Sequence, residues 1–238
     1  MPSSSHGTGT NSTSSGRHEA RSALLNYCAE EGVLLIEDDP YGQLRYIGEP
    51  LPSLLELETE SADFDASATG GVVYVGTFSK ILMPGLRVGF AIGPTHVIDK
   101  LVEAKQAADL HTSTLNQWIV LELCQMGFIE EFVPRLCREY RARRDAMLCA
   151  LDKHLPETFS WTRPEGGMFL WLRLPENLDA ALRLTAALGK KVAFVPGQEF
   201  HADGAGKNTI RLNFSGATPE RIEIGIARLA QALLAPKP

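Results

Sequence analysis

The stretch VYVGTFSKILMPGLRVGF, residues 73–90, decides the fold. It opens inside an apolar run, Val72 to Val75, of the kind that forms a strand covered on both faces. The polar cluster Thr77-Phe78-Ser79-Lys80 follows directly. A second run, Val88 to Ile92, comes after a short loop with proline and glycine. This stretch predicts two strands, with a lysine just beyond the carboxyl end of the first.

The sequence upstream repeats the arrangement. Val33 to Ile36 is another continuous apolar run, and Glu37-Asp38-Asp39-Pro40-Tyr41-Gly42 follows it. Ligands of open α/β sheets bind outside the carboxyl ends of the strands, so the two polar clusters predict one site. A helix is expected from Arg17 to Glu31, with Gly32 as its stop. The first 16 residues, rich in Ser, Thr and Gly, predict a disordered segment.

Downstream, apolar residues at three- and four-residue spacing predict helices over 97–108, 114–126 and 129–154. The last of them is long and charged, as a helix linking two lobes is, and Pro134 is expected to bend it near its start. Strands over 167–174 and 210–214 and a helix from Pro219 to Leu234 complete the chain. These later elements lack regular βα alternation, which favours a separate α+β lobe.

Composition narrows the class of protein. A net charge of -6 over 238 residues argues against a general nucleic-acid binder. The four cysteines form no CxxC pair and have no histidine at metal spacing, so free thiols are expected and no metal site. No apolar run approaches the roughly 20 residues of a membrane span, and the N-terminus does not resemble a signal peptide. We therefore expect a cytoplasmic enzyme or binding domain.

Lys80 carries the chemistry that the residues suggest. An amine at a strand end, close to a second cation, suits a covalent nucleophile. Thr77, Ser79 and Arg87 offer two hydroxyls and a forked cation for a phosphate. Taken singly, each residue also has a structural interpretation: Lys80 as a solvated surface residue, Asp38 as a turn cap, Tyr41 as a packed strand-edge aromatic, Arg211 as a surface cation.

Several segments together resemble one family. Residues 73–90 resemble the Schiff-base region of fold-type-I pyridoxal-phosphate (PLP) aminotransferases. EDDPYGQLRY, residues 37–46, resembles the strand-end motif of their 2-aminoadipate, kynurenine and multisubstrate group. Four further stretches match in order and approximate spacing: KQAADLHTSTLNQ (105–117), TRPEGGMFLWLRLP (162–175), FVPGQEF (194–200) and NTIRLNFS (208–215). The resemblance runs from about Arg17 to the C-terminus.

The resemblance implies a role for each matching residue. Lys80 would form the Schiff base with PLP and then move the proton between the substrate and the cofactor. Asp38 would keep the pyridine nitrogen protonated. The remaining roles are a hydrogen bond from Tyr41 to the phenolic oxygen, a phosphate site of Thr77, Ser79 and Arg87, and a clamp by Arg211 on the substrate α-carboxylate. His111, in LHTST, is expected to be a structural histidine.

The sequence departs from the family pattern at a turn. Family members carry an Asn-Pro-Thr-Gly turn before the helix that precedes the EDDPY strand. Here the matching stretch is Asn11-Ser12-Thr13-Ser14, which lacks both the proline and the glycine. By this match Asn11 is a cofactor-binding residue.

The larger departure is the missing N-terminal half of the family fold. The expected architecture is therefore α/β: a partial PLP-transferase large domain with a mostly parallel sheet, then a small α+β domain. The expected division is 1–16 irregular, 17–127 large-domain remnant, and 128–238 linking helix with the small domain. Such a remnant leaves apolar sheet edges and faces exposed. We expect little activity from the chain alone.

The resemblance implies a reaction. It is the transfer of an amino group from an L-amino acid, such as 2-aminoadipate or an aromatic or branched one, to a 2-oxo acid such as 2-oxoglutarate. PLP is the implied cofactor, and a homodimer the implied assembly. The alternative is the aminotransferase-like effector domain of a GntR-type transcription regulator. Such a regulator carries a winged-helix domain upstream, so the upstream sequence distinguishes the two hypotheses.

Overall fold

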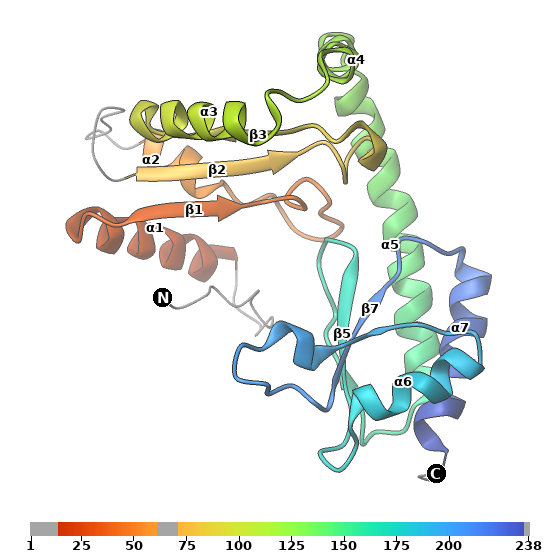
Figure 1. Ribbon diagram of the computed structural model, residues 1–238. Helices are drawn as coiled ribbons and strands as arrows, with labels where there is room; N and C mark the ends of the chain where they lie inside the picture. Colours follow the sequence, from red (N-terminus) through yellow and green to blue (C-terminus); the bar gives the residue numbers. More distant parts are fainter. Residues whose placement is uncertain (1–13, 61–70, 236–238) are drawn as a thin grey trace. The chain divides into compact units, whose positions relative to one another are not determined.

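A computed structural model describes residues 14–60 and 71–235 (Figure 1). The described residues fall into two compact units, which divide between Leu136 and Cys137, inside a long helix. The expectations for residues 1–13, including the irregular segment and Asn11, lie outside the described residues. Each unit is considered in turn.

The first unit is built on a three-stranded sheet in the order β1-β2-β3. Strands β1 (Leu34–Asp38) and β2 (Gly71–Thr77) are parallel, with Asp38 paired to Val75. Strand β3 (Gly89–Ile92) is antiparallel to β2. The short 3-10 turn η1 (Pro84–Leu86) explains this reversal, because parallel neighbours need a much longer crossover. The sequence predicted all three strands.

Two helices lie against β1 and β2 in this unit. Helix α1 (Ser14–Glu30) begins three residues before the predicted start, and Gly32 ends it in the left-handed region at φ 61°. Helix α2 (Leu54–Thr59) was not predicted, although Ser53 and Glu56 form a capping box at its start. Helix α1 contacts both α2 and β1. Glu37 of β1 joins them: its carboxylate accepts from the Leu54 amide at 2.7 Å and pairs with Arg21 at 3.0 Å.

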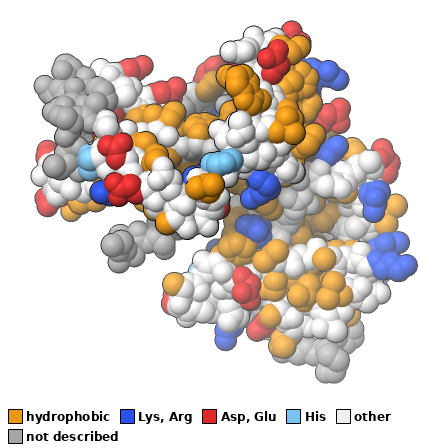
Figure 2. All heavy atoms as spheres, turned by 45° about the horizontal axis from the view of Figure 1, so that its top comes forward, with side chains coloured by type: hydrophobic (Ala, Val, Ile, Leu, Met, Phe, Trp, Pro, Cys, Tyr) orange, Lys and Arg blue, Asp and Glu red, His pale blue; other side chains and the backbone are white. Residues whose placement is uncertain are grey.

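Three consecutive helices follow: α3 (Thr95–Asp109), α4 (Thr114–Gln125) and α5 (Phe128–His154). They confirm the predicted periodicity, and α5 continues through Pro134. Helix α4 exposes large apolar side chains, with Leu115 69% and Trp118 63% exposed. Figure 2, which brings the top of Figure 1 forward, shows apolar side chains gathered over this part of the surface. Among the described helices, none is long and apolar enough to cross a membrane.

The second unit contains a four-stranded antiparallel sheet in the order β4-β5-β7-β6. Its strands are β4 (Ser160–Trp161), β5 (Phe169–Arg173), β6 (Val195–Pro196) and β7 (Thr209–Asn213). The predicted strands over 167–174 and 210–214 correspond to β5 and β7. Alternate residues of these two strands are buried, namely Leu170, Leu172, Ile210 and Leu212. They form one face of the sheet, since successive strand side chains point to opposite faces.

Helices α6 (Ala180–Gly189) and α7 (Pro219–Leu234) pack on each other in this unit. Helix α7 has the predicted bounds, with Thr218 capping it and Pro219 at the first helical position. Helix α6 was not predicted, although Asp179 caps it through the amides of Ala181 and Leu182. The 3-10 turn η2 (Gly197–Phe200) leads out of β6.

Candidate active site

Lys80 lies in the turn that follows β2. The Thr77 hydroxyl organises this turn, because it accepts from the Ser79 amide at 3.1 Å and lies 3.0 Å from the Ser79 hydroxyl. The Phe78 amide donates to the Val88 carbonyl at 3.1 Å, which ties the turn to the chain entering β3. Lys80 is half-buried in this setting. These hydrogen bonds thus fix the backbone of the turn from which the Lys80 side chain extends.

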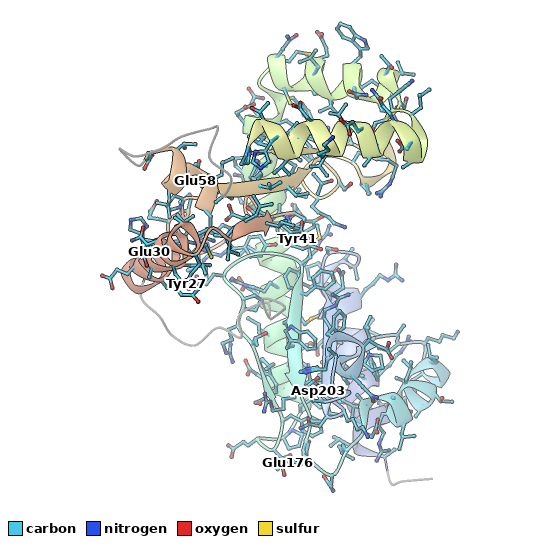
Figure 3. The ribbon with its side chains drawn as sticks, turned by 60° about the vertical axis from the view of Figure 1, so that its left-hand side comes forward. Tyr27, Glu30, Tyr41, Glu58, Glu176 and Asp203 are labelled. Atoms are coloured by element: carbon cyan, nitrogen blue, oxygen red, sulfur yellow. The ribbon has the colours of Figure 1, made fainter. Side chains whose placement is uncertain are left out.

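The end of β1 brings a second group to the same sheet edge. Since β1 and β2 are parallel, their carboxyl ends lie side by side. Asp38 is the last residue of β1 and is exposed, and Tyr41 lies in the loop that follows it (Figure 3). The Lys80 Nζ atom lies 6.0 Å from the centroid of the Tyr41 ring. The structure therefore brings Asp38, Tyr41, Thr77, Ser79 and Lys80 to one edge.

Arg87 stands at the end of η1 in a backbone conformation that is unusual for arginine. Its φ and ψ are 54° and 39°, in the left-handed region. A residue other than glycine there carries strain, and such strain is found mainly at functional positions. The Arg87 side chain is exposed and donates to the Pro84 carbonyl at 3.3 Å. Its guanidinium is therefore accessible to an anion.

The first turn of α4 contacts this region through a residue that the sequence did not point to. The Asn116 side chain donates to the Leu86 carbonyl at 2.9 Å, next to Arg87. His111, in the loop between α3 and α4, is exposed, and its Nδ1 lies 2.8 Å from the Thr112 carbonyl. Asn116 therefore helps to hold η1, whereas His111 makes a local backbone contact.

Asp39 and Tyr74 form a pair that sequence reasoning missed. The Tyr74 hydroxyl donates to Asp39 Oδ2 at 3.3 Å, and the Gly42 amide donates to Asp39 Oδ1 at 2.6 Å. Burial, followed by the negative charge of Asp39, raises the pKa of Tyr74 to about 12. Tyr74 is therefore a neutral hydrogen-bond donor at physiological pH.

Arg211 lies in the second unit, on the half-buried face of its sheet. It pairs with Trp171 across β5 and β7, on the face opposite to the buried leucines. Its guanidinium carbon lies 4.3 Å from the centroid of Phe169 and 4.2 Å from that of Phe200. Phe200 in turn meets the edge of Trp171, with ring centroids 5.2 Å apart. Two aromatic rings thus lie against the cation, and a third packs against one of them.

One nitrogen of the Arg211 guanidinium, Nε, is a buried donor without a hydrogen-bond acceptor among the described residues. An arginine in this state is suited to a planar anion such as a carboxylate, which can accept two parallel hydrogen bonds. The alternation of β5 and β7 could have identified Phe169 as its neighbour. Phe200 comes from a distant turn and gave no signal.

Comparison with known proteins identifies relatives of the chain. The family model described as "Aminotransferase class I and II" matches residues 17–229. A 2-aminoadipate transaminase of Thermus thermophilus is 47% identical over 90% of this chain and 52% of its own length. The crystal structure of LysN, an α-aminoadipate aminotransferase of the same organism, matches with a TM-score of 0.83 at 46% identity. That match covers 90% of this chain and 54% of the solved one, which is complexed with N-(5'-phosphopyridoxyl)-L-leucine.

A more distant relative bears on the alternative hypothesis. The uncharacterized HTH-type transcriptional regulator YisV of Bacillus subtilis is 32% identical over 90% of this chain and 42% of its own length. The chain is thus more similar to the transaminase than to this regulator. It spans about half the length of the curated relatives that it matches.

Proposed function

Because the chain belongs to the class I and II aminotransferases, we propose that it supplies the Lys80 side of a PLP-dependent transaminase site. The observation that carries this proposal is that the Lys80 Nζ atom lies 6.0 Å from the centroid of the Tyr41 ring, at the sheet edge where β1 ends in Asp38. The donor set also fits PLP chemically. It combines an amine for the aldehyde, a carboxylate for the pyridine nitrogen, and two hydroxyls with a guanidinium for the phosphate.

PLP, when bound, would supply an aldehyde carbon and an electron-withdrawing ring. The Lys80 amine would hold PLP through this aldehyde. The same amine would move a proton between the substrate Cα and the cofactor. Asp38 would hold the proton on the pyridine nitrogen, and Tyr41 would donate to the phenolic oxygen. The roles of Lys80, Asp38 and Tyr41 are inferred from the chemistry of each side chain and from its place at the edge where β1 and β2 end.

The phosphate and the substrate have separate candidate residues. Thr77, Ser79 and Arg87 would bind the phosphate, and Arg211 would bind the substrate α-carboxylate. The proposed reaction moves an amino group from an L-amino acid to a 2-oxo acid. The substrates suggested by the resemblance are 2-aminoadipate and aromatic or branched amino acids, with 2-oxoglutarate as acceptor. The 2-aminoadipate transaminase and the LysN structure, which is complexed with a phosphopyridoxyl derivative of leucine, support 2-aminoadipate and a branched amino acid.

The assembly, the domain boundaries and the location belong to the same proposal. We propose a homodimer in the cytoplasm, a large-domain part over 17–127, and a small domain with its linking helix over 128–238. The regulator-type effector domain is the weaker candidate, because the transaminase is 47% identical and the regulator 32%. A winged-helix domain encoded directly upstream would reverse this order.

The experiment that tests the proposal is reductive labelling of the chain. Saturating PLP followed by borohydride should place a pyridoxyl group on Lys80, as read by peptide mapping. Lys80→Ala should lose this label. Lys100→Ala, which removes a 75% exposed lysine of α3, should keep it. Equal labelling of several surface lysines, with none favouring Lys80, would contradict the proposal.

A further inference from the structure

The Asp39 carboxylate lies on the opposite face of the sheet from Asp38. The Asp39 amide donates to the Val75 carbonyl at 3.0 Å, so the strand ladder continues past the end of β1. Successive side chains of a strand alternate between faces, and Asp39 meets Tyr74, the residue in register with Glu37. The Asp39 side chain therefore lies on the face of the sheet opposite to Asp38, although both residues stand at the same strand end.

Asp39 holds the backbone on both sides of Pro40 and Tyr41. Its own amide is fixed to β2, and its carboxylate accepts from the Gly42 amide at 2.6 Å. A methyl group added at Gly42 would overlap this carboxylate, so the two residues are in close contact. Beyond Gly42, the Tyr41 carbonyl accepts from the amide of Leu44, which is fully buried. The turn that carries Tyr41 is thus anchored at both ends.

Tyr74 holds the Asp39 carboxylate in turn. Its hydroxyl donates to the second carboxylate oxygen at 3.3 Å. The centroid of its ring lies 6.1 Å from that of Phe90 on β3. Gly76, between them on β2, leaves the space that the Phe90 ring fills. The carboxylate therefore connects the Tyr41 turn to the neighbouring aromatic side chains of Tyr74 on β2 and Phe90 on β3. Such support decides how well a functional side chain is held.

We propose that Asp39 is a positioning residue, whose carboxylate fixes the turn that places Tyr41 beside Lys80. This inference rests on the proposed function for the meaning of the Tyr41–Lys80 geometry. It assigns Asp39 no contact with cofactor or substrate. The raised pKa of Tyr74 is consistent with it, because a neutral tyrosine keeps its hydroxyl proton for Asp39.

The first test is amide hydrogen exchange at Gly42 in the chain as it is. Asp39→Ala should speed Gly42 exchange by about tenfold or more, since a hydrogen bond to a charged acceptor is lost. Asp39→Asn should restore most of the protection, because an amide oxygen also accepts. The matched control is Asp109→Ala, a 58% exposed carboxylate of α3, which should leave Gly42 unchanged. The amides of β2 must stay protected in every variant, which excludes unfolding.

The second test asks whether Asp39 and Tyr41 affect the labelling of Lys80 independently. If Asp39 acts only by positioning Tyr41, the effects of the two substitutions should not add. Asp39→Ala and Tyr41→Phe should lower the pyridoxyl yield on Lys80 to a similar extent, and the double variant should lose no more than either. Gly42→Ala, which displaces the carboxylate without removing it, should behave like Asp39→Ala. Unchanged Gly42 exchange in Asp39→Ala would overturn the inference, as would fully additive losses in the double variant. If the unaltered chain gives no label, the proposed function fails, and the Gly42 exchange alone decides whether Asp39 holds the turn.

Discussion

The Lys80 Nζ atom lies 6.0 Å from the ring centroid of Tyr41, although the two residues follow different strands. Parallel pairing of β1 with β2 is the reason, since it brings both strand ends to one edge. The hydrogen bonds of Thr77 and Asp39 then fix each turn separately. Both turns are thus defined by hydrogen bonds within the protein itself.

Arg87→Gly should make the protein more stable and a poorer phosphate binder. Arg87 has φ 54°, which costs a residue with a side chain about 1 kcal/mol and glycine almost nothing. Urea unfolding should therefore show a gain of about that size, whereas the yield of PLP label on Lys80 falls. Arg87→Lys keeps the charge but loses the fork, so it should fall between the two in labelling. A loss of stability in Arg87→Gly would show that the arginine side chain is needed for the fold.

Tyr74→Phe should change how stability depends on alkaline pH. The folded pKa of Tyr74 is about 12, above its ordinary value of 10.0, because burial and Asp39 disfavour the phenolate. Its contribution to stability is thus fully present below pH 10 and is lost as the pH rises towards 12. The difference in unfolding free energy between the unaltered protein and Tyr74→Phe should shrink over this range. Tyr27→Phe, which removes a 61% exposed tyrosine of α1, serves as the comparison.

Continuous apolar runs followed by polar clusters made the strands β1 and β2 predictable. The same pattern predicted that the carboxyl ends of the two strands lie at one edge. Helix α7 was predictable to its bounds because Thr218, Pro219 and a regular apolar period all agree. Helices α2 and α6 were missed, although their caps Ser53 and Asp179 were visible in the sequence. Both are short, so a cap without a long period gave too little signal.

The site was less predictable where it depends on tertiary packing. The left-handed backbone of Arg87 has no local signature, because glycine is the residue that usually marks such a position. The contact of Asp39 with Tyr74 depends on strand register, which the sequence did not specify. Phe200 reaches Arg211 only because η2 folds onto β7. The assignment of Asn11 stays a prediction, since it lies outside the described residues.

Phe200→Leu should expose the Arg211 Nε–H to water. That nitrogen is buried without an acceptor among the described residues, and Phe200 lies 4.2 Å from the guanidinium carbon. Exchange of the Nε proton, followed by NMR, should become faster in the variant. The Phe200 ring also orients the guanidinium, so the variant should bind a carboxylate at Arg211 about two- to fivefold more weakly, as expected if about 0.5–1 kcal/mol of orienting contact is lost. Leu182→Ala, on the exposed side of α6, should change neither quantity.

The apolar surface of α4 should make the isolated chain associate. Leu115 and Trp118 are 69% and 63% exposed, beside an apolar hollow lined by Trp118, Ile119, Glu122 and Leu123. Contiguous apolar surface of this kind drives association in water. Leu115→Lys combined with Trp118→Lys should lower the apparent mass in light scattering at high concentration. Leu182→Lys, at a 77% exposed position of α6, is the matched control, and an equal effect there would mean that added charge alone is responsible.

The chain produced alone should bind PLP weakly and show no measurable aminotransferase activity. It spans about half the length of its curated relatives, and its candidate phosphate donors are the side chains of Thr77, Ser79 and Arg87. Each missing hydrogen bond to a charged group forfeits about 1.5–3 kcal/mol, and about 1.4 kcal/mol is a tenfold change in affinity. Two or three missing donors would therefore weaken PLP binding by several powers of ten.

Supplying the part of the relatives that this chain does not span should tighten PLP binding. Fusion to the part of the Thermus thermophilus transaminase that this chain does not span should tighten PLP binding by powers of ten and produce turnover. The same fusion with Lys80→Ala should show no turnover, which excludes activity from the added half. Tight PLP binding with normal turnover by the unfused chain would contradict the prediction. The side chains of Thr77, Ser79 and Arg87 would then suffice, or a second copy of the chain would provide further donors.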